Sequence, residues 1–406
     1  LKPVDYREVA KRIQSVIGVI QEHDSGERFC KLGARVEFGN ASFTDEHSVI
    51  LNGEKYSAKS WVIATGSSPA VPSIEGLDKT PYMTNKEIFS LDSLPKSIIA
   101  IGGGPISSEL AQAFNRLGTK VTVLELGNQI LGVEDKDMAD RLMDILISEG
   151  IIFHLSSSVL GVKDWGNEKE VIVRDNNGNT HSLRAETILV AVGRQANLKG
   201  LGIEDISLEF DRKGLKVDDW LRTSHRHIFA AGDATGAYQF THAAGYEGGI
   251  VVSNAVLHIP READYTNLPW CTYTDPELAS IGMNEKRAAA AGIHYSVWTE
   301  EFEANDRSLA EGEEAGKIKL LLNEHEKPIG IQILGPHAGE LVSEWVSIVN
   351  GKVKLSTIAS AVHPYPTLGE INKKVVVNFF SGKIFSEKVK KALKFFFSLK
   401  GRACGA

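Results

Sequence analysis

Cysteine is scarce in this chain of 406 residues, which carries only Cys30, Cys271 and Cys404. The three thiols lie far apart in the sequence, so no CxxC or CxxxxC spacing occurs. The sequence therefore predicts neither a zinc cluster nor a local redox pair, and no metal ligand is expected among the site residues. So few thiols suit a reducing compartment, and we expect a cytoplasmic protein.

Long apolar segments and an excess of positive charge are also missing. No apolar run approaches the roughly eighteen residues of a membrane-spanning helix. The formal net charge is −7, which argues against nucleic acid as a partner. The length indicates two or three domains, and the 38 glycines and 42% hydrophobic residues are typical of a large α/β protein.

Residues 97–125 have the order of a dinucleotide-binding unit. The apolar segment Ser97–Ile101 predicts a buried parallel strand, and three glycines at 102–104 predict a tight turn. A helix is expected from Pro105, and the next apolar strand ends at Glu125. Glycine lets the backbone approach a pyrophosphate, and the helix N-terminus offers N–H groups and the positive end of its dipole.

The acid that closes this unit indicates which nucleotide binds. Glu125 lies 23 residues after Gly102, and an acid at about this distance accepts the adenosine ribose hydroxyls. A carboxylate would repel a 2′-phosphate, so we expect NAD rather than NADP. Ser107 stands where the motif has its third glycine and is small enough for close helix–strand packing. The predicted NAD contacts are Gly102, Gly104, Pro105, Ile106 and Glu125.

Periodicity predicts the remaining elements only coarsely. The expected elements are a helix over 3–24, short strands over 34–63, a proline-rich crossover over 66–95, a helix over 135–149, a β-meander over 159–190, a small β region over 215–233, a helix over 243–257 and an α+β domain over 268–375.

The last segment, residues 383–406, differs from the rest of the chain. Its apolar residues recur at helical spacing, and seven Lys or Arg against one Glu give it a charge of +6. A basic amphipathic helix can lie on an anionic membrane surface. It can equally dock on its own protein or on a partner subunit, and the sequence favours this docking.

Four further stretches complete a family pattern. They are residues 61–69 (WVIATGSSP), 189–197 (LVAVGRQAN), 223–248 with Gly232-Asp233, and 273–282 (YTDPELASIG). Together with residues 97–125 they resemble the class I pyridine nucleotide-disulfide oxidoreductases, which include dihydrolipoamide dehydrogenase, glutathione reductase and mercuric reductase. The resemblance covers about residues 30–380.

The resemblance implies an α/β fold with two nucleotide-binding three-layer domains and a C-terminal α+β dimerisation domain. The expected domains are the remainder of an incomplete FAD-binding domain (1–76), a Rossmann-like NAD-binding domain (77–196), a second part of the FAD-binding domain (197–264), the dimerisation domain (265–380) and the basic amphipathic tail (381–406). A homodimer is implied, in which each subunit completes the other's active site.

The resemblance also assigns cofactor residues. Thr65 and Gly66 match the family turn that passes close to FAD, and Asp233 matches the aspartate whose carboxylate accepts ribityl hydroxyls. Glu109 and Gly193 match positions beside the nicotinamide. The remaining predicted flavin contacts are Gly232, His242 and Ala243.

The family's catalytic histidine is replaced in this sequence. Disulfide-reducing members read His-x-His-Pro-Thr with a Glu five residues after the second His, and here Tyr365 occupies that second position while Glu370 keeps its place. An imidazole with a pKa near 6.5 exchanges protons at neutral pH, whereas a phenol near 10 seldom does. The candidate catalytic residues are therefore Tyr365, Glu370 and His363. Mercuric reductases resemble this chain in having Tyr there, and their substrate is a soft metal ion.

The family's N-terminal segment carries another GxGxxG unit and a Cys-x4-Cys pair, and neither occurs in this sequence. We therefore expect an incomplete form of an FAD-dependent oxidoreductase that passes hydride from NADH through flavin to a disulfide or soft-metal acceptor. Two alternatives stay open. One is an NADH-dependent flavin oxidase or quinone reductase of the same fold, and the other is a non-catalytic, dimeric nucleotide-binding scaffold.

Overall fold

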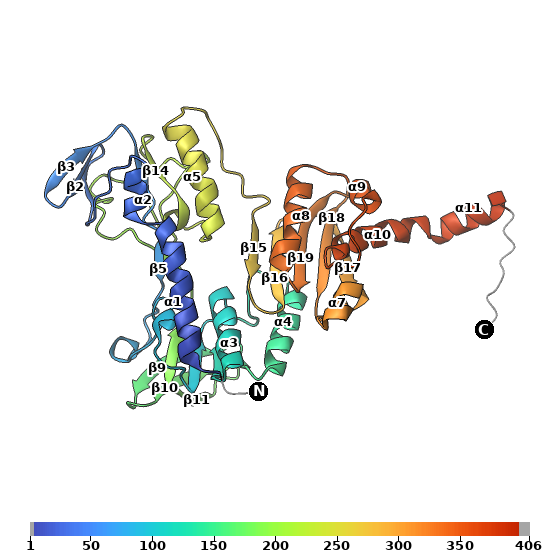
Figure 1. Ribbon diagram of the computed structural model, residues 1–406, viewed down its shortest axis with the longest axis horizontal. Coiled ribbons are helices and arrows are strands. Elements are labelled where there is room, and N and C mark those ends of the chain that lie inside the picture. The colour runs from blue at the N-terminus through green and yellow to red at the C-terminus, as the bar shows by residue number, and fades with distance from the viewer. Residues whose placement is uncertain (1–3, 398–406) are drawn as a thin grey trace. The chain divides into compact units, whose positions relative to one another are not determined.

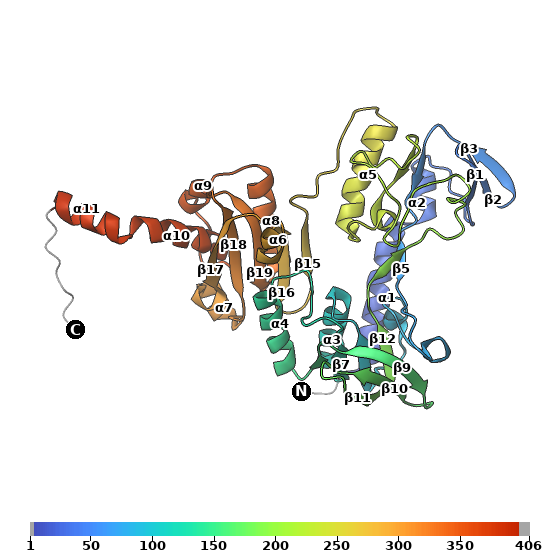
Figure 2. The same cartoon turned by 180° about the vertical axis from the view of Figure 1, so that it is seen from behind.

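Two compact units make up the chain, and the computed structural model describes residues 4–397. The first unit contains residues 1–130 and 146–265, and the second contains residues 131–145 and 266–406. Figures 1 and 2 show the elements of each unit from opposite sides. Within the described residues, no helix is both long enough and apolar enough to cross a bilayer.

A parallel sheet with strand order β12-β6-β7-β8 forms part of the first unit. Its strands are β6 (Ser97–Ile101), β7 (Lys120–Leu124), β8 (Ile152–His154) and β12 (Thr187–Val190). Helix α3 (Pro105–Leu117) joins β6 to β7, because parallel neighbours need a crossover connection. The carboxyl ends of β6, β7 and β12 therefore meet at one edge of the sheet.

An antiparallel meander covers this sheet. Its strands are β9 (Ser158–Asp164), β10 (Lys169–Arg174) and β11 (Thr180–Ala185). Val171 and Val173 alternate along β10 and are buried in one cluster with Ile99, Leu124 and Ile188 of the sheet. The strand period of two thus places the apolar face of the meander on the sheet.

The other strands of the first unit lie before β6 and after β12 in the sequence. They are β1 (Ser42–Asp45), β2 (Ser48–Leu51), β3 (Glu54–Ser57), β4 (Trp61–Ile63), β5 (Ser67–Pro69), β13 (Arg194–Ala196) and β14 (Ile228–Ala230). β4 pairs in parallel with β14, and β5 pairs antiparallel with β13. Ile63, Ile228 and Phe43 share one core cluster, so the segments around residues 60 and 230 fold together.

Further helical segments belong to the described part of the first unit. They are α1 (Tyr6–His23), α2 (Gly26–Lys31), the 3-10 helices η1 (Leu77–Lys79), η2 (Glu87–Ser90) and η3 (Gly232–Thr235), and α5 (Thr241–Ala255). The predicted helix over 3–24 is confirmed as α1. Its apolar face is largely uncovered within the described residues, since Ile17 and Ile20 are exposed and Tyr6 is its buried residue.

The structure corrects two expected elements. The β region expected over 215–233 contains only β14 as a strand, because the Asp218 carboxylate binds the amides of Trp220 and Arg222 and holds a turn there. In the tail, α10 (Glu370–Ile384) runs past Lys383, and a separate helix α11 (Glu387–Phe397) follows. The rest of the predicted tail, with Cys404, lies outside the described residues.

The second unit is built on an antiparallel sheet with strand order β15-β16-β19-β18-β17. Its strands are β15 (Pro269–Thr272), β16 (Glu277–Gly282), β17 (Tyr295–Glu301), β18 (Lys317–Asn323) and β19 (Pro328–Gly335). Its other helices are α4 (Lys136–Ser148, up to Ile145 in this unit), α6 (Glu285–Ala290), η4 (Phe302–Ala304), α7 (Asp306–Glu311), α8 (Ala338–Asn350) and α9 (Leu355–Ser360).

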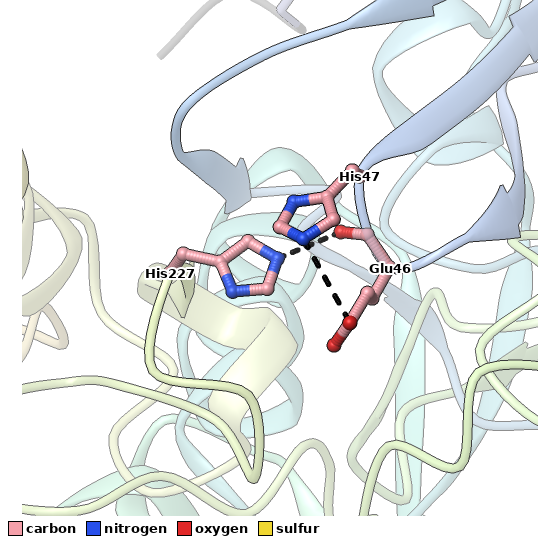
Figure 3. Close-up of side chains that lie close together, drawn as sticks. All are labelled: Glu46, His47 and His227. Carbon is pink, nitrogen blue, oxygen red and sulfur yellow. Dashed lines mark hydrogen bonds and ion pairs between the residues drawn. The ribbon is translucent and has the colours of Figure 1, made fainter.

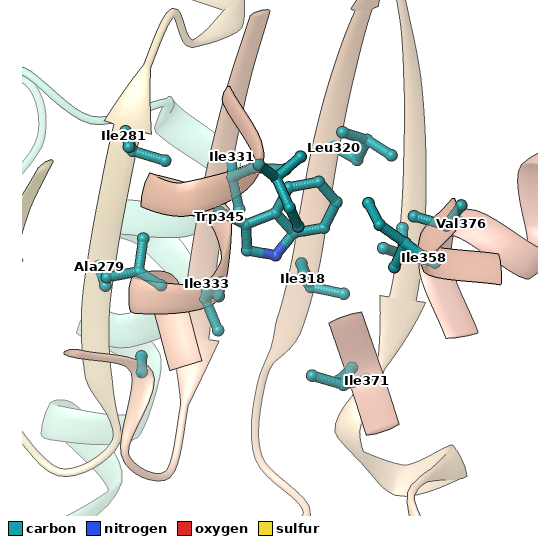
Figure 4. Close-up of a cluster of buried hydrophobic side chains, with 14 of the residues drawn as sticks. Ala279, Ile281, Ile318, Leu320, Ile331, Ile333, Trp345, Ile358, Ile371 and Val376 are labelled. Carbon is teal, nitrogen blue, oxygen red and sulfur yellow. The ribbon is translucent and has the colours of Figure 1, made fainter. Parts of the chain in front are cut away.

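Trp345 is at the centre of the core of this unit (Figure 4). Its side chain is fully buried among aliphatic residues of β18 and β19, such as Ile318 and Ile331. Its indole N–H donates to Asn372 Oδ1 at 2.8 Å, which satisfies the one polar group of the ring. The sheet and the helices α8 and α10 are therefore packed on one contiguous core.

A buried carboxylate ties the short segment 131–145 to this sheet. Glu134 accepts hydrogen bonds from Trp270 Nε1 at 2.5 Å, Ser280 Oγ at 2.7 Å and Gln332 Nε2 at 2.6 Å. Burial raises the pKa of Glu134, and the three hydrogen bonds oppose that rise. The Glu134 carboxylate thus holds residues 131–145 on the sheet through hydrogen bonds donated by β15, β16 and β19.

A buried lysine reinforces the same attachment. Lys319 Nζ lies 3.1 Å from Asp135, 2.5 Å from Asp137 and 2.8 Å from Glu285. Burial acts to lower the pKa of Lys319, but the carboxylates raise it overall. Three acids around one buried ammonium group compensate its desolvation.

We expect Glu134→Ala to destabilise the second unit. The substitution leaves three donors unpaired in the core, and each costs about 1–3 kcal/mol, so the local free energy of opening falls by at least ~3 kcal/mol. Hydrogen exchange measured by mass spectrometry on peptides covering β16 and β19 reports this change. Glu303→Ala, at an exposed position of the same unit, is the control and shifts exchange by no more than about 0.5 kcal/mol. Equal hydrogen-exchange protection of β16 and β19 in both variants would contradict the role of Glu134 in attaching residues 131–145 to the sheet.

Candidate nucleotide-binding site

The turn after β6 has no room for a side chain. Gly102 has a φ of 107°, and a Cβ built there would lie 2.4 Å from the carbonyl oxygen of Ala191. Its amide donates to Leu124 O at 2.8 Å. The backbones that leave β6, β7 and β12 therefore crowd together here, and only glycine fits.

Glu125 lies directly beside this turn, at the end of β7. Its carboxylate accepts hydrogen bonds from the amides of Gly103 and Gly127, each at 2.5 Å. These two bonds fix the orientation of the side chain. Each carboxylate oxygen keeps a further lone pair that can accept a ribose hydroxyl.

Helix α3 begins at Pro105, and among the described residues no side chain caps its first turn. The amides of Ile106 and Ser107 belong to that turn, where N–H groups have no partner within the helix. A Cβ built on Gly104 would meet no atom within 4 Å. Open space therefore adjoins the positive end of the helix dipole, which fits the pyrophosphate of a dinucleotide.

Ser107 occupies the place of the motif's third glycine and is completely buried. Its hydroxyl has no hydrogen-bond partner among the described residues. The small side chain thus fits between helix and sheet, as the sequence predicted.

Asp233 follows β14 and is held by two side chains. Ser67 Oγ donates a hydrogen bond to Asp233 Oδ2, and Arg194 Nε lies 3.4 Å from the same oxygen. Arg194 Nε also donates to Ser67 Oγ at 2.7 Å. The carboxylate is thereby oriented and partly neutralised, while its other oxygen can accept hydroxyl groups.

A buried acid supports the backbone beneath Asp233. Glu247 on α5 is fully buried and accepts hydrogen bonds from Gly232 N at 2.6 Å and from Tyr265 Oη at 2.7 Å. Burial raises the pKa of Glu247, and the negative charge of Asp233 raises it further. The two bonds fix the turn at Gly232, whose φ is 70°.

Thr65 and Gly66 lie where β4 leads into β5. Thr65 Oγ1 donates to Asn197 O at 2.7 Å, and Asn197 Nδ2 donates back to Thr65 O at 3.0 Å. The Thr65 hydroxyl is thus engaged with the chain that follows β13. Gly66 is the member of this pair that lines the cleft described next.

One cleft of about 730 Å³ connects the two groups of residues. Ile106 of the first turn of α3 and Asp233 after β14 both line it, together with Gly66, Arg194 and Gly248. Its volume lies within the usual range for cofactor sites, about 300–1,000 Å³. Ile106 is thus the residue predicted for NAD that lines this cleft, and it does so together with Gly66, Gly232 and Asp233, which were predicted for flavin.

Not every predicted residue contributes to the lining of this cleft. Ala243 is completely buried, and it is Ala244 that lines the cleft. His242 is exposed and stacks on Phe240, with ring centroids 5.3 Å apart. Gly193 directly follows the segment that crowds Gly102, and Glu109 is partly exposed on α3. Their contacts with a cofactor stay predictions.

The three candidate catalytic residues cluster before and at the start of α10. Tyr365 is 70% exposed, and its hydroxyl donates to Asp306 Oδ2 at 2.8 Å. This hydrogen bond and the charges of Asp306 and Glu370 raise the pKa of Tyr365. His363 Nε2 lies 3.1 Å from Glu344 Oε1. The phenol is therefore bound to an aspartate that the sequence did not single out.

Sequence reasoning missed the residues that hold Asp233. Ser67, Arg194 and Glu247 occur inside the quoted motifs, but their pattern carries no signal of their roles. Each comes from a different segment, and only the pairing of β5 with β13 and of β4 with β14 brings them together. Asp306 and Glu344 were missed for the same reason.

The parallel sheet, the glycine turn and the shared cleft define a dinucleotide-binding α/β protein with sites suited to a nicotinamide nucleotide and a flavin. Residues 4–248 match the pyridine nucleotide-disulphide oxidoreductase family, and residues 268–376 match the dimerisation domain of that family. The chain belongs to the pyridine nucleotide-disulphide oxidoreductase family. This family binds FAD and NAD(P), and the predicted fold class is confirmed.

Mercuric reductases and dihydrolipoyl dehydrogenases are among the proteins similar to this chain. The chain is 31% identical over 343 residues to a mercuric reductase of Staphylococcus aureus, an alignment of 84% of this chain and 62% of the relative. It is 31% identical over 374 residues to a dihydrolipoyl dehydrogenase of Bacillus subtilis, with 90% and 80% covered. The chain thus spans about three-fifths of the length of the mercuric reductase.

Solved structures share the fold. The HOCl-induced flavoprotein disulfide reductase RclA from Escherichia coli superposes with a TM-score of 0.83 at 25% identity, covering 93% of this chain and 86% of that chain. A Cu(II) complex of RclA gives a TM-score of 0.77 at 26% identity, covering 84% and 78%.

We expect Glu125→Gln to weaken the preference for NADH over NADPH by about tenfold, or ~1.4 kcal/mol. The amide no longer repels a 2′-phosphate and accepts ribose hydroxyls less strongly. Titration of each nucleotide, followed by its fluorescence, measures the two dissociation constants. Glu186→Gln is the matched control, because that carboxylate also accepts a backbone amide, Lys96 N at 2.7 Å, but at the opposite edge of the sheet. An unchanged ratio in Glu125→Gln would overturn the assignment.

Proposed function

We propose that the protein containing this chain is an FAD-dependent oxidoreductase that uses NADH to reduce a disulfide or a soft metal ion. The observation that carries the proposal is the single cleft lined by Ile106 and Asp233. When bound, FAD accepts a hydride equivalent from NADH and passes electrons onward.

In this proposal the residues of the first unit bind NADH and the flavin and orient them. The glycine turn and the first turn of α3 hold the pyrophosphate of NADH, and Glu125 accepts its ribose hydroxyls. Asp233 accepts ribityl hydroxyls of the flavin while Ser67 and Arg194 keep its carboxylate in place. The apolar lining of the cleft, such as Val62 and Val251, excludes water.

Tyr365 supports a soft-metal acceptor more than a dithiol. Its hydroxyl is bound to Asp306 and its pKa is raised, so it stays protonated at neutral pH and is a poor base for a thiol. A mercuric reductase is among the similar proteins, and RclA has been solved as a Cu(II) complex. These similarities favour Hg(II) or Cu(II) as the ions to test first.

The dimerisation domain supports a homodimer, which we include in the proposal. We also propose a reducing, cytoplasmic location, on the basis of the low cysteine content. An alternative within the same fold is an NADH oxidase or a quinone reductase, in which oxygen or a quinone is the electron acceptor. A non-catalytic scaffold is the candidate from another class.

Anaerobic addition of NADH to the purified full-length protein that contains this chain, saturated with FAD, tests the proposal. We expect the visible flavin absorption to bleach within the time of mixing and to return when Hg(II), Cu(II) or a disulfide is added. Recovery only with oxygen or a quinone would support the oxidase or quinone reductase. A protein that binds NADH but never bleaches flavin would defeat the proposal and favour the scaffold.

The substitution Tyr365→His distinguishes the reduction of the acceptor from the transfer of hydride to the flavin. A titratable imidazole restores the base that dithiol chemistry needs, so we expect disulfide reduction to rise at least tenfold, while flavin bleaching by NADH is unchanged. Steady-state rates with a disulfide and with Cu(II) measure the change. Tyr365→Phe, which keeps the ring and removes the hydroxyl, serves as control and gives no gain. No gain with histidine would show that residue 365 does not set the acceptor.

We further propose that α11 makes a peripheral membrane contact. Phe395 and Phe396 are 81% and 78% exposed, and Lys388, Lys390 and Lys391 lie on the same short helix. Exposed aromatic rings beside lysines match the apolar and anionic parts of a lipid surface. Docking on another part of the protein or on a partner subunit is the competing role.

Co-sedimentation with vesicles tests this contact. We expect binding to phosphatidylcholine vesicles that contain phosphatidylserine and none to pure phosphatidylcholine. Lys390→Gln with Lys391→Gln weakens the binding roughly thirtyfold if each lysine contributes about 1 kcal/mol. Lys213→Gln with Lys216→Gln makes the same charge change in the first unit as a control. Equal binding of both double variants would refute the contact.

A further inference from the structure

Three histidines and a glutamate gather on the first unit, outside the cleft. Glu46 and His47 form the turn between β1 and β2, and His225 and His227 lie in the loop that leads into β14. Figure 3 shows Glu46, His47 and His227 converging from these two segments. None of these residues lines the cleft, and none is among the residues predicted for FAD or NAD.

The donor atoms are close enough to share an ion. His47 Nε2 lies 3.7 Å from Glu46 Oε1, and the rings of His47 and His227 stack with centroids 4.3 Å apart. One ligand atom from each of Glu46, His47 and His227 can be chosen so that all lie within 4.8 Å of one another. Zinc binds imidazole and carboxylate at about 2.0–2.2 Å, so its ligand atoms are roughly 3–3.5 Å apart. Binding an ion therefore requires that these side chains rotate until the donors reach that spacing.

His225 orients the glutamate. Its Nδ1 lies 3.1 Å from Glu46 Oε2, and its Nε2 is 2.7 Å from the carbonyl oxygen of Ile206. These two contacts, one to a carboxylate and one to a backbone carbonyl, hold the ring in one orientation. The proposed ligand His227 also has a contact with a carbonyl, because its Nε2 lies 2.8 Å from the backbone oxygen of Glu46. A ligating histidine typically donates one ring N–H to such an oxygen and binds the metal through its other nitrogen, which is Nδ1 in His227.

The cluster also differs from the acidic group around Lys319. Asp135, Asp137 and Glu285 are close enough to bind a cation, but Lys319 Nζ already lies among them. Among the described residues, the ion pairs of Glu46 are with histidines alone. The nearby Lys55 pairs with Asp45 instead.

We propose that Glu46, His47 and His227 bind a divalent transition-metal ion of the zinc type, with His225 as a positioning residue. Two imidazoles and a carboxylate are ligands that Zn²⁺ accepts. The ion joins the β1–β2 turn to the loop that begins β14, and β14 ends just before Asp233. Its role is to fasten a surface hairpin to the strand that positions the flavin aspartate.

Zinc titration of the full chain tests the site. The protein is stripped with EDTA, its cysteines are blocked with iodoacetamide, and ZnCl₂ is added in a calorimeter. We expect one saturable site and a rise in Tm with zinc. His47→Ala with His227→Ala weakens the binding at least tenfold and abolishes the rise in Tm.

His325→Ala is the matched control, because His325 also lies beside an adjacent glutamate, at 3.4 Å from Glu324, and within residues 4–397 no second imidazole joins them. This variant keeps the wild-type affinity. Glu46→Gln, which retains the shape of the side chain, gives a second loss of affinity should the double variant fold poorly. Equal zinc affinity of the wild type, the double variant and Glu46→Gln, or no binding to the wild type, would overturn the site.

Discussion

Close approach of three backbone segments at Gly102 is the constraint on which the nucleotide site depends. Because a side chain there would collide with Ala191 O, glycine alone lets β6 turn directly into α3. The same closeness brings the amide of Gly103 to Glu125 and leaves open space at Gly104. A single steric requirement thus places the N-terminal end of α3 and the Glu125 carboxylate side by side, and these are the groups that we propose bind the pyrophosphate and the ribose.

The flavin side depends instead on charge compensation. Asp233 is useful only if its carboxylate is oriented, and Ser67 and Arg194 achieve this from the β5–β13 pair. Glu247 fixes the turn at Gly232 by accepting its amide hydrogen bond. The raised pKa of Glu247 reflects both its burial and the charge of Asp233. The second unit uses the same device, with Glu134 as the buried acid that attaches residues 131–145.

Local patterns predicted the elements well where neighbours in sequence are also neighbours in space. The β6–α3–β7 unit, the short strands expected over 34–63 and helix α1 all follow from short-range spacing. Over 215–233 the pattern was right only for β14, because before that strand side chains such as Asp218 bind the backbone amides and hold turns. It also predicted an apolar face on α1 without showing that this face would be largely uncovered.

The sequence alone determined the class of the protein, because glycines, the acid at 125 and the ordered motifs carry chemistry that does not need coordinates. It also determined the exchange of histidine for Tyr365. Tertiary structure decided which residues act together: Ser67 and Arg194 with Asp233, Asp306 with Tyr365, and His47 with His227. Hydrogen bonds and ion pairs act over a few ångströms, and only the pairing of distant strands brings such groups that close.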